Sequence, residues 1–182
     1  MFAGKEATMA DSTSKEDAAA EGRTVSHSLV SLSQVIMPQQ AGPGGVFAHG
    51  GDIMKMMDTA AGLVALRHAH SQVVTLRVEG INFLLPIRVG NYVTATARIT
   101  YASQSSMEIQ VRVTAEDVLR EREWEALTAY FIFVAVDKEG KPQKVPPLIL
   151  ENDEDRRLFE AGRLRHDTCR IDDEARALCA LE

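Results

Sequence analysis

The sequence predicts an α+β domain in which an antiparallel sheet wraps around one long helix. Two observations carry this prediction. Residues 52–69 have an almost wholly apolar pattern at helical spacing, and residues 72–137 read as a series of strands. A helix that is apolar nearly all round must be covered by other structure, and the sheet is the available cover.

The segments before the helix are a leader, a strand and a loop. Residues 1–24 mix small, polar and charged side chains without a hydrophobic period, which predicts a disordered leader. Residues 26–36 alternate apolar and polar side chains, as a half-buried strand does. The Pro- and Gly-rich segment that follows predicts an irregular loop. The predicted domain covers residues 25–150.

Four segments after the helix read as antiparallel strands, at residues 73–83, 92–101, 107–114 and 127–136. The second and third are joined by a short connection and form a long hairpin. The fourth is nearly continuously apolar, so we expect a central strand that is covered on both faces. Residues 151–182 are charged and favour a helical tail, which docks on the body or on a neighbouring subunit.

Composition excludes several classes of function. The chain has 182 residues, 45% of them hydrophobic and 25% charged, which is typical of one soluble domain. Its net charge of -6 gives no long-range attraction for nucleic acid or anionic membrane. The sequence has no apolar run of ~20 residues and no secretory signal, so we expect a cytoplasmic protein.

Metal and disulfide chemistry are also not expected. Cys169 and Cys179 are too few for a zinc site or a disulfide framework, so we expect both thiols to be reduced and inert. His68 and His70 have no third ligand at zinc-like spacing.

Asp58 is the most informative residue of the helix, because it is the only charged side chain between Lys55 and Arg67. Aspartate is a poor residue for the middle of a helix, and an ionised carboxylate in apolar surroundings is costly. One interpretation is a general base or nucleophile that faces a ligand. The other is a structural carboxylate that caps a loop or pairs with a partner subunit.

His49, Gly50 and Gly51 stand directly before the helix. The glycines allow a close backbone approach, and the free N–H groups of a helix start can stabilise an oxyanion. The alternative is a simple turn and helix cap. Asp58 lies about 10 Å along the axis from Gly51 at ~1.5 Å per residue, which is far for two groups that act on one carbonyl. The spacing therefore suggests a site shared by two subunits.

The arginines have an ordinary and a functional interpretation. Most are expected to form a solvated face, although small clusters could hold a nucleotide phosphate. The sequence contains no nucleophile elbow of the G-x-S-x-G type and no P-loop. The arginines considered are Arg88, Arg98, Arg112, Arg156, Arg157, Arg163 and Arg165.

Four segments occur in an order that resembles a known family. They are HGGDIMKMMDTAAGLVALRHA, VTLRVEGINFLLPIRVGNYV, SSMEIQVRV and AYFIFVAVDKEGKPQKVPPL. Together they resemble the hotdog-fold acyl-CoA thioesterases of the brain type and the bacterial YciA type, over about residues 35–148. The resemblance implies a sheet around a helix, dimerisation through the sheet edge, and a homohexamer built as a trimer of dimers. Pairing of the edges also protects them from aggregation.

The activity that this resemblance implies is hydrolysis of fatty acyl-CoA thioesters to fatty acid and CoA, without a cofactor. Asp58 stands where the family has its catalytic carboxylate, which acts as a general base or a nucleophile. The amide of Gly50 or Gly51 from the facing subunit would polarise the carbonyl, with His49 beside them. The helix and the facing strands would line an acyl tunnel.

The resemblance also implies residues that hold the CoA. Ser105 and Ser106 fall in the corresponding hairpin segment, and we count Arg88 with them as a substrate-binding residue. The sequence departs from the family at two places. Relatives carry an asparagine near Gly42, for which Gln39, Gln40 or His49 could substitute, and Gln104 replaces an arginine.

Two other functions remain open at this stage. A protein of the same fold could bind or sense acyl-CoA without turnover. A hotdog hydratase is the third candidate, but it requires an Asp and His pair on the loop before the helix, where His49 alone is available.

Overall fold

The computed structural model describes residues 21–179, with burial assigned as far as Thr168. The short elements at the beginning and end of the domain lie side by side. In chain order the elements are β1 (Arg23–Thr24), α1 (Val25–Ser28), β2 (Val30–Val35), η2 (Pro38–Gln40), α2 (Gly50–Ala69), β3 (Gln72–Phe83), β4 (Tyr92–Ala102), β5 (Ser106–Asp117), η3 (Val118–Arg120), β6 (Arg122–Val136), β7 (Leu148–Ile149) and α3 (Asp153–Cys179).

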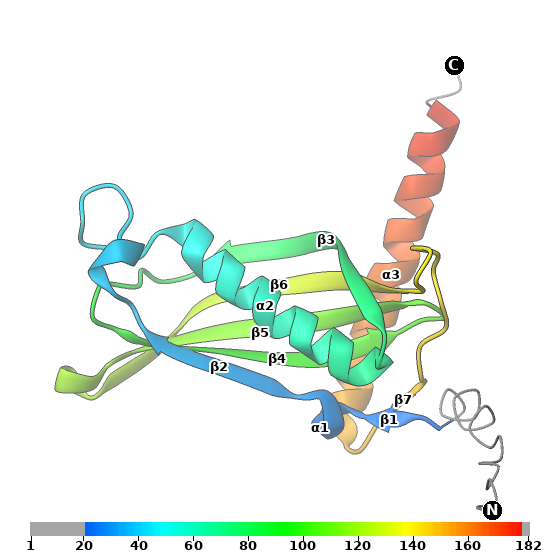
Figure 1. Cartoon of the computed structure of the whole chain (residues 1–182), viewed down its shortest axis with the longest axis horizontal. Coiled ribbons are helices and arrows are strands. Elements are labelled where there is room, and N and C mark those ends of the chain that lie inside the picture. Colours follow the sequence, from blue (N-terminus) through cyan, green and yellow to red (C-terminus); the bar gives the residue numbers. More distant parts are fainter. Residues whose placement is uncertain (1–20, 180–182) are drawn as a thin grey trace, which may run out of the picture.

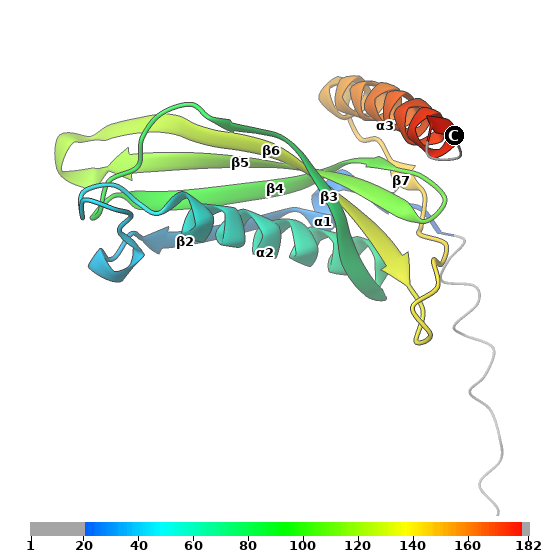
Figure 2. The ribbon, with the colours of Figure 1, turned by 90° about the horizontal axis from the view of Figure 1, so that it is seen from above.

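Five strands form one antiparallel sheet in the order β2-β4-β5-β6-β3, which leaves β2 and β3 as its two edges. β4 and β5 pair as the predicted hairpin. Helix α2 runs along one face of this sheet, and α3 lies on the opposite face (Figures 1 and 2). The predicted α+β architecture, with a sheet around a long helix, is confirmed.

The core lies between α2 and the inner face of the sheet. Ile53, Met57 and Val64 are at most 2% exposed, and two alanines beside them let the helix approach the strands closely. Phe131 and Phe133 of β6 face them from the sheet. Buried side chains of the helix and the strands pack into this space. The acyl tunnel expected between the helix and the strands stays a prediction.

Two expectations about burial were wrong for the single chain: that α2 is enclosed all round, and that the fourth predicted strand is covered on both faces. Helix α2 is not enclosed all round, because Met54, Leu63 and Leu66 are 37–44% exposed. Strand β6 is fully buried on one face only: on its outer face Tyr130 and Ile132 are half-buried. Both surfaces are apolar, so their composition alone does not reveal that they are partly open.

The N-terminal part of the predicted first strand is a helical turn. Thr24 Oγ1 accepts a hydrogen bond from the His27 amide at 3.2 Å and caps the short α1, so the strand starts only at Val30. Residues 1–20 of the predicted leader lie outside the described residues. The last two residues of the predicted leader, Arg23 and Thr24, pair in parallel with β7 and therefore form a strand. The division into leader, domain and tail otherwise stays a prediction.

Helix α3 is fixed to the outer face of the sheet by a buried ion pair. Glu108 is 3% exposed, and Arg165 donates to its two oxygens at 2.9 and 2.8 Å. Thr100 Oγ1 also donates to Glu108, at 2.6 Å. These hydrogen bonds raise the pKa of Arg165 above its usual value. Glycine at position 162 permits the contact, because a Cβ there would lie 2.8 Å from Tyr101 Cβ.

His68 is a buried structural histidine. Its Nε2 donates to the Pro146 carbonyl at 2.9 Å, and its Nδ1 accepts from Ser28 Oγ at 3.3 Å. Burial lowers the pKa of His68, so the neutral ring that satisfies both bonds is the stable form. Within residues 21–179 no group of three potential ligands gathers into a metal site. No helix in this range is long and apolar enough to span a membrane.

Removal of Glu108 should destabilise the protein far more than removal of an exposed carboxylate of α3. We expect Glu108→Ala to lower the free energy of unfolding by about 2 to 3 kcal/mol, since Arg165 loses its acceptor and Thr100 keeps only its 3.2 Å hydrogen bond to the backbone carbonyl of residue 108. Glu154 pairs with Arg98 at 2.9 Å but is 59% exposed, and Glu154→Ala should cost less than about 1 kcal/mol. Urea unfolding measures both, and equal losses would contradict the assigned role of Glu108.

Candidate active site

Asp58 lies on the face of α2 that turns toward the edge strand β3. Thr75 Oγ1 of β3 donates to Asp58 Oδ1 at 3.0 Å, and this is its one hydrogen bond within the described residues. The side chain is exposed, so the buried, apolar setting expected for this carboxylate was wrong for a single chain. The hydroxyl of Thr75 fixes one oxygen of the carboxylate and leaves Oδ2 available to a proton donor.

The surface around Asp58 is apolar although it is exposed. Its members come from the open face of α2 and from β3, and they have 37–64% of their surface exposed. An apolar surface beside an edge strand with one free side is typical of an interface. We call this the edge surface; it consists of Met54, Leu66, Leu76 and Val78.

The three residues at the start of α2 have different roles in the structure. His49 is the N-cap, and its Nδ1 accepts from the Gly51 amide at 3.1 Å. The Gly51 amide is therefore already bonded. The Gly50 amide has no acceptor within residues 21–179. Of the two glycines, Gly50 is thus the one that can donate to a ligand.

An apolar cavity of about 330 Å³ adjoins Gly50 at the N-terminal end of α2. It lies between the start of α2 and residues of β3 and β6, and its use as an acyl tunnel stays a prediction. The space is open to solvent in the single chain, because Phe47, Phe83, Leu84 and Leu85 of its lining are 46–59% exposed. The cavity is lined by Phe47, Ala48, Gly50, Ile53, Phe83, Leu84, Leu85, Pro86, Ile87 and Leu127.

One chain does not bring Gly50 and Asp58 together. Both lie on α2, and their separation along the helix is about 12 Å at 1.5 Å per residue. No carbonyl group can contact the two groups at once over that length. The geometry agrees with the sequence-based expectation of a site shared by two chains, and that sharing stays a prediction.

Ser105 and Ser106 lie in the turn between β4 and β5, away from Gly50. Ser106 Oγ bonds Ser103 Oγ at 2.7 Å, and the Ser105 carbonyl accepts from the Ala135 amide at 3.0 Å. Ser106 lines a small hollow on the outer face of the sheet, next to Arg165. The structure thus gives both serines local partners, and their contact with CoA stays a prediction.

Gln40 does not lie near Asp58 either. Its Oε1 accepts from the Met37 amide at 3.0 Å, and its side chain lines a hollow with Lys55 and Thr59 on the β2 side of α2. Asp58 faces the other way, toward β3. Within one chain, Gln40 therefore gives no replacement for the loop asparagine.

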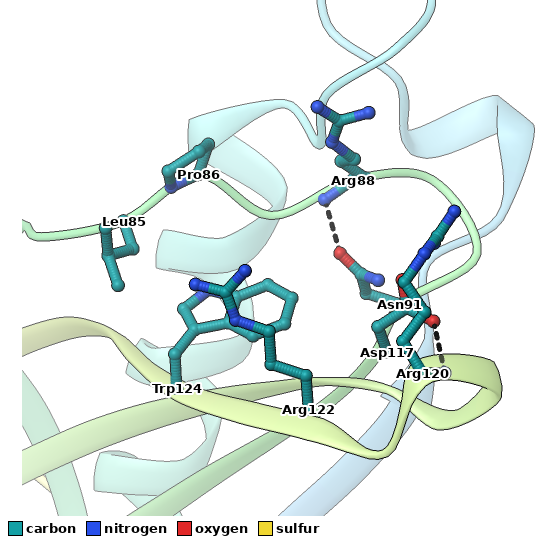
Figure 3. A pocket seen from close by; sticks show the side chains of 8 residues that line it. All are labelled: Leu85, Pro86, Arg88, Asn91, Asp117, Arg120, Arg122 and Trp124. Atoms are coloured by element: carbon teal, nitrogen blue, oxygen red, sulfur yellow. Dashed lines mark hydrogen bonds and ion pairs between the residues drawn. The ribbon is translucent and has the colours of Figure 1, made fainter.

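Arg88 lies in the loop between β3 and β4, and its guanidinium stands 5.4 Å from the centre of the Phe47 ring. It lines a second cavity with Arg120, Arg122 and Trp124 (Figure 3). Of the other arginines that we considered, Arg157 has no carboxylate partner within the described residues, and the rest bind carboxylates. Those with carboxylate partners are Arg98, Arg112, Arg156, Arg163 and Arg165.

Thr75 and the residues that accompany Arg88 were not predicted from the sequence. Thr75 reads as an ordinary strand residue, because only the fold shows that it faces Asp58. Arg120 and Arg122 stand beside the single tryptophan of the chain, and that grouping of charge with an aromatic side chain was a usable signal.

Comparisons with known proteins agree with one family. The model of the Thioesterase superfamily matches residues 45–121. The YciA acyl-CoA thioester hydrolase of Salmonella typhimurium is 38% identical over 119 residues, which cover 63% of this chain and 88% of that protein. The mouse cytosolic acyl coenzyme A thioester hydrolase is 40% identical over 148 residues, or 80% of this chain. The match spans only 39% of the length of that mouse protein.

Two solved structures extend the comparison to three dimensions. An acyl-CoA hydrolase of Staphylococcus aureus, in complex with butyryl-CoA, CoA and CoA disulfide, has a TM-score of 0.77 and 29% identity, over 88% of this chain and 99% of the other. A hexameric thioesterase of Yersinia pestis has a TM-score of 0.59 and 36% identity, over 63% of this chain and 93% of the other.

His49 should contribute to stability through the helix cap. We expect His49→Ala to lower the free energy of unfolding by about 1 kcal/mol, because the Gly51 amide loses its acceptor. Asparagine also caps helices well, so His49→Asn should stay within about 0.5 kcal/mol of the wild type. Thermal and urea unfolding provide the measurement. Equal stability of the wild type and His49→Ala would argue against the capping role.

Proposed function

We propose, on the premise that this chain belongs to the acyl-CoA thioester hydrolases of the Thioesterase superfamily, with their hotdog fold, that it hydrolyses acyl-CoA to a free acid and CoA. The observation that carries the proposal is the position of Asp58. Its carboxylate is oriented by Thr75, and it lies within the edge surface, where a second chain would cover it.

A symmetric dimer through β3 would complete the site. Phe83 contacts the position of Gly50, Thr75 holds Asp58, and Glu79 lies midway between Thr75 and Phe83 on β3. Two β3 strands paired antiparallel about an axis near Glu79 place Thr75 of one chain opposite Phe83 of the other. That pairing brings Asp58 of one chain toward the Gly50 amide of its partner.

The chemistry then follows from two groups. Asp58 Oδ2 accepts a proton from water while the water oxygen attacks the thioester carbon. The carbonyl oxygen becomes negatively charged and accepts a hydrogen bond from the partner's Gly50 amide. The carbon–sulfur bond breaks, and the thiolate of CoA leaves and is protonated. Because Thr75 binds only Oδ1, we favour the general base over the nucleophile for Asp58.

The assembly and the location of the protein are part of the same proposal. Pairing through β3 makes a dimer, and we infer a trimer of dimers because the similar Yersinia pestis thioesterase is hexameric. We place the protein in the cytoplasm, by analogy with the mouse relative that is named cytosolic. The substrate is a fatty acyl-CoA, and neither nucleic acid nor a membrane is a partner. The alternative function, binding or sensing of acyl-CoA without hydrolysis, is an outcome of the test below.

Asp58→Asn should abolish most of the turnover. We expect kcat for a series of acyl-CoA esters to fall by about 100-fold or more, as on loss of a general base. Released thiol is measured with a colorimetric reagent. Asp52→Asn on the same helix is the matched control, because Asp52 lies in the first turn and faces the hollow on the β2 side. A wild-type protein that binds acyl-CoA but releases no thiol would instead establish the sensor.

Mixed assemblies test whether two chains share one site. Gly50→Pro removes the amide hydrogen at a helix position that accepts proline, and Gly50→Ala is its control because it adds a Cβ but keeps the hydrogen. We expect Gly50→Pro and Asp58→Asn each to be at least about 100-fold impaired. Co-expressed with separate tags, they should regain about a quarter of the wild-type activity, because half of the dimers carry one intact site. No recovery in verified mixed dimers would contradict sharing.

A further inference from the structure

Helix α3 is longer than the part of the sheet that lies beneath it. Its 27 residues span about 40 Å at ~1.5 Å per residue. The strands that it passes are β4, β5, β6 and β3, which are neighbours in the sheet. At a spacing of ~4.8 Å these four strands take up only about 15 Å. In Figure 1 the last turns of α3 lie beyond β3, past the edge of the sheet.

The contacts of α3 fix where it crosses the sheet. Asp155 binds an arginine of β4, and Arg165 binds Glu108 of β5. The guanidinium of Arg165 also stands 4.1 Å from the centre of the Tyr130 ring on β6. Tyr130 pairs with Glu79 of β3, and Arg165 lines a small hollow together with Glu79. At Arg165 the helix has therefore reached β6 and approaches β3 close to Glu79.

This crossing lies close to the axis of the dimer through β3, so the inference rests on the proposed function, of which that pairing is part. The axis lies about 7 Å beyond β6, or one and a half strand spacings of ~4.8 Å. At ~1.5 Å per residue, α3 covers this distance within about five residues of Arg165. The last turns of α3 then lie over the partner's sheet. A twofold axis reverses the direction of each helix, so the two α3 helices lie side by side and antiparallel.

One side of α3 faces the partner's helix in this arrangement. Arg165 turns toward Tyr130, the pairing partner of Glu79, whereas His166 packs on Tyr101 with ring centres 5.3 Å apart. Because the dimer axis lies near Glu79, the side of α3 that carries Arg165 is the one turned toward the axis. Helical spacing of three and four residues extends this side in both directions along α3. We call it the clasp row; it consists of Ala161, Arg165, Thr168, Asp172 and Arg176.

We propose that the two α3 helices of a dimer pair antiparallel through their clasp rows and so hold the β3 edges together. The row is complementary to its own reverse: with Thr168 near the axis, Arg165 of each chain lies opposite Asp172 of the other. Arg165 uses Nε and Nη2 for Glu108, and its Nη1 has no acceptor among the residues whose side chains are described. Nη1 is thus the donor for the carboxylate of the second chain. The small Thr168 lets the two backbones approach each other.

Cross-linking at single cysteines tests the pairing. In a chain with Cys169→Ser and Cys179→Ser, Thr168→Cys should join two chains through a short bismaleimide, because a residue near a twofold axis meets its own copy. Leu164→Cys is the matched control: Leu164 is 54% exposed but lies about 200° around the helix from Gly162, which contacts the sheet. We expect at least about fivefold more linked dimer from Thr168→Cys than from Leu164→Cys. Equal yields, or no linked dimer from Thr168→Cys, would overturn the proposal.

Sedimentation measures how much the clasp contributes to the dimer. A chain that ends at Thr168 keeps the ion pair of Arg165 with Glu108 but loses the turns that overlap the partner. We expect its dimer dissociation constant to rise at least about tenfold, whereas a chain that ends at Cys179 should match the full chain. Asp172→Ala should raise the constant about fivefold, and Glu174→Ala, which removes an equal charge outside the clasp row, should not. A truncated chain that dimerises like the full chain would contradict the clasp.

Cross-linking through Glu79→Cys in the same cysteine-free chain separates this inference from the proposed function, and melting temperatures verify that every variant folds. If Glu79→Cys joins two chains but Thr168→Cys does not, the dimer through β3 stands and the clasp is wrong. If Thr168→Cys joins them while the wild type releases no thiol from acyl-CoA, the clasp stands and the hydrolase proposal fails. If Glu79→Cys joins none, the β3 pairing is wrong and the clasp fails with it.

Discussion

The close packing of α2 against the sheet decides where every functional group of the molecule lies. Ala60, Ala61 and Ala65 bring the helix backbone near the strands, and the large side chains of the sheet fill the remaining space. The same contact fixes the rotation of the helix. With one face committed to the core, the opposite face must carry Met54, Asp58 and Leu66 outward, next to the edge strand β3.

That arrangement gathers exposed apolar side chains of α2 and β3 into one region. The outer face of the sheet is occupied by α3, which Glu108 and Arg165 bind in place. The edge surface around Asp58 has no such cover within residues 21–179. An edge strand that is apolar on its flanks is stable in water when another strand pairs with it. The candidate catalytic residue therefore lies on the surface where a second copy of the chain would remove exposed apolar side chains from water.

The sequence allowed the fold to be predicted well, because period and apolarity identify strands and a buried helix directly. Helix α2 and strands β3 to β5 lie within a few residues of their expected ranges, whereas β6 begins at Arg122, before the predicted 127–136. The errors have physical causes. Residues 25–28 turn because Thr24 caps them, a local hydrogen bond that an alternating pattern does not reveal. The exposure of Asp58 depends on helix rotation, and an all-round apolar pattern contains no information about that rotation.

The candidate site was predictable in part. Asp58 and the glycines were found because their residue types are unusual for their positions, whereas Thr75 has the type that any strand favours. Which of the two glycine amides is free depends on which one donates to His49. The sequence spacing of His49, Gly50 and Gly51 does not determine this. The clustering of Arg88 with Arg122 joins segments that only the sheet brings together.

The parallel pairing of β1 with β7 has a practical consequence for labelling and fusion. It ties the chain's entry to the C-terminal end of α2, where Arg23 also donates to the carbonyls of Arg67 and His68. Gly50 lies at the other end of that helix, about 30 Å away at 1.5 Å per residue. A fluorophore or a covalently joined protein attached at Glu21 is thus held far from the Gly50 amide of the same chain.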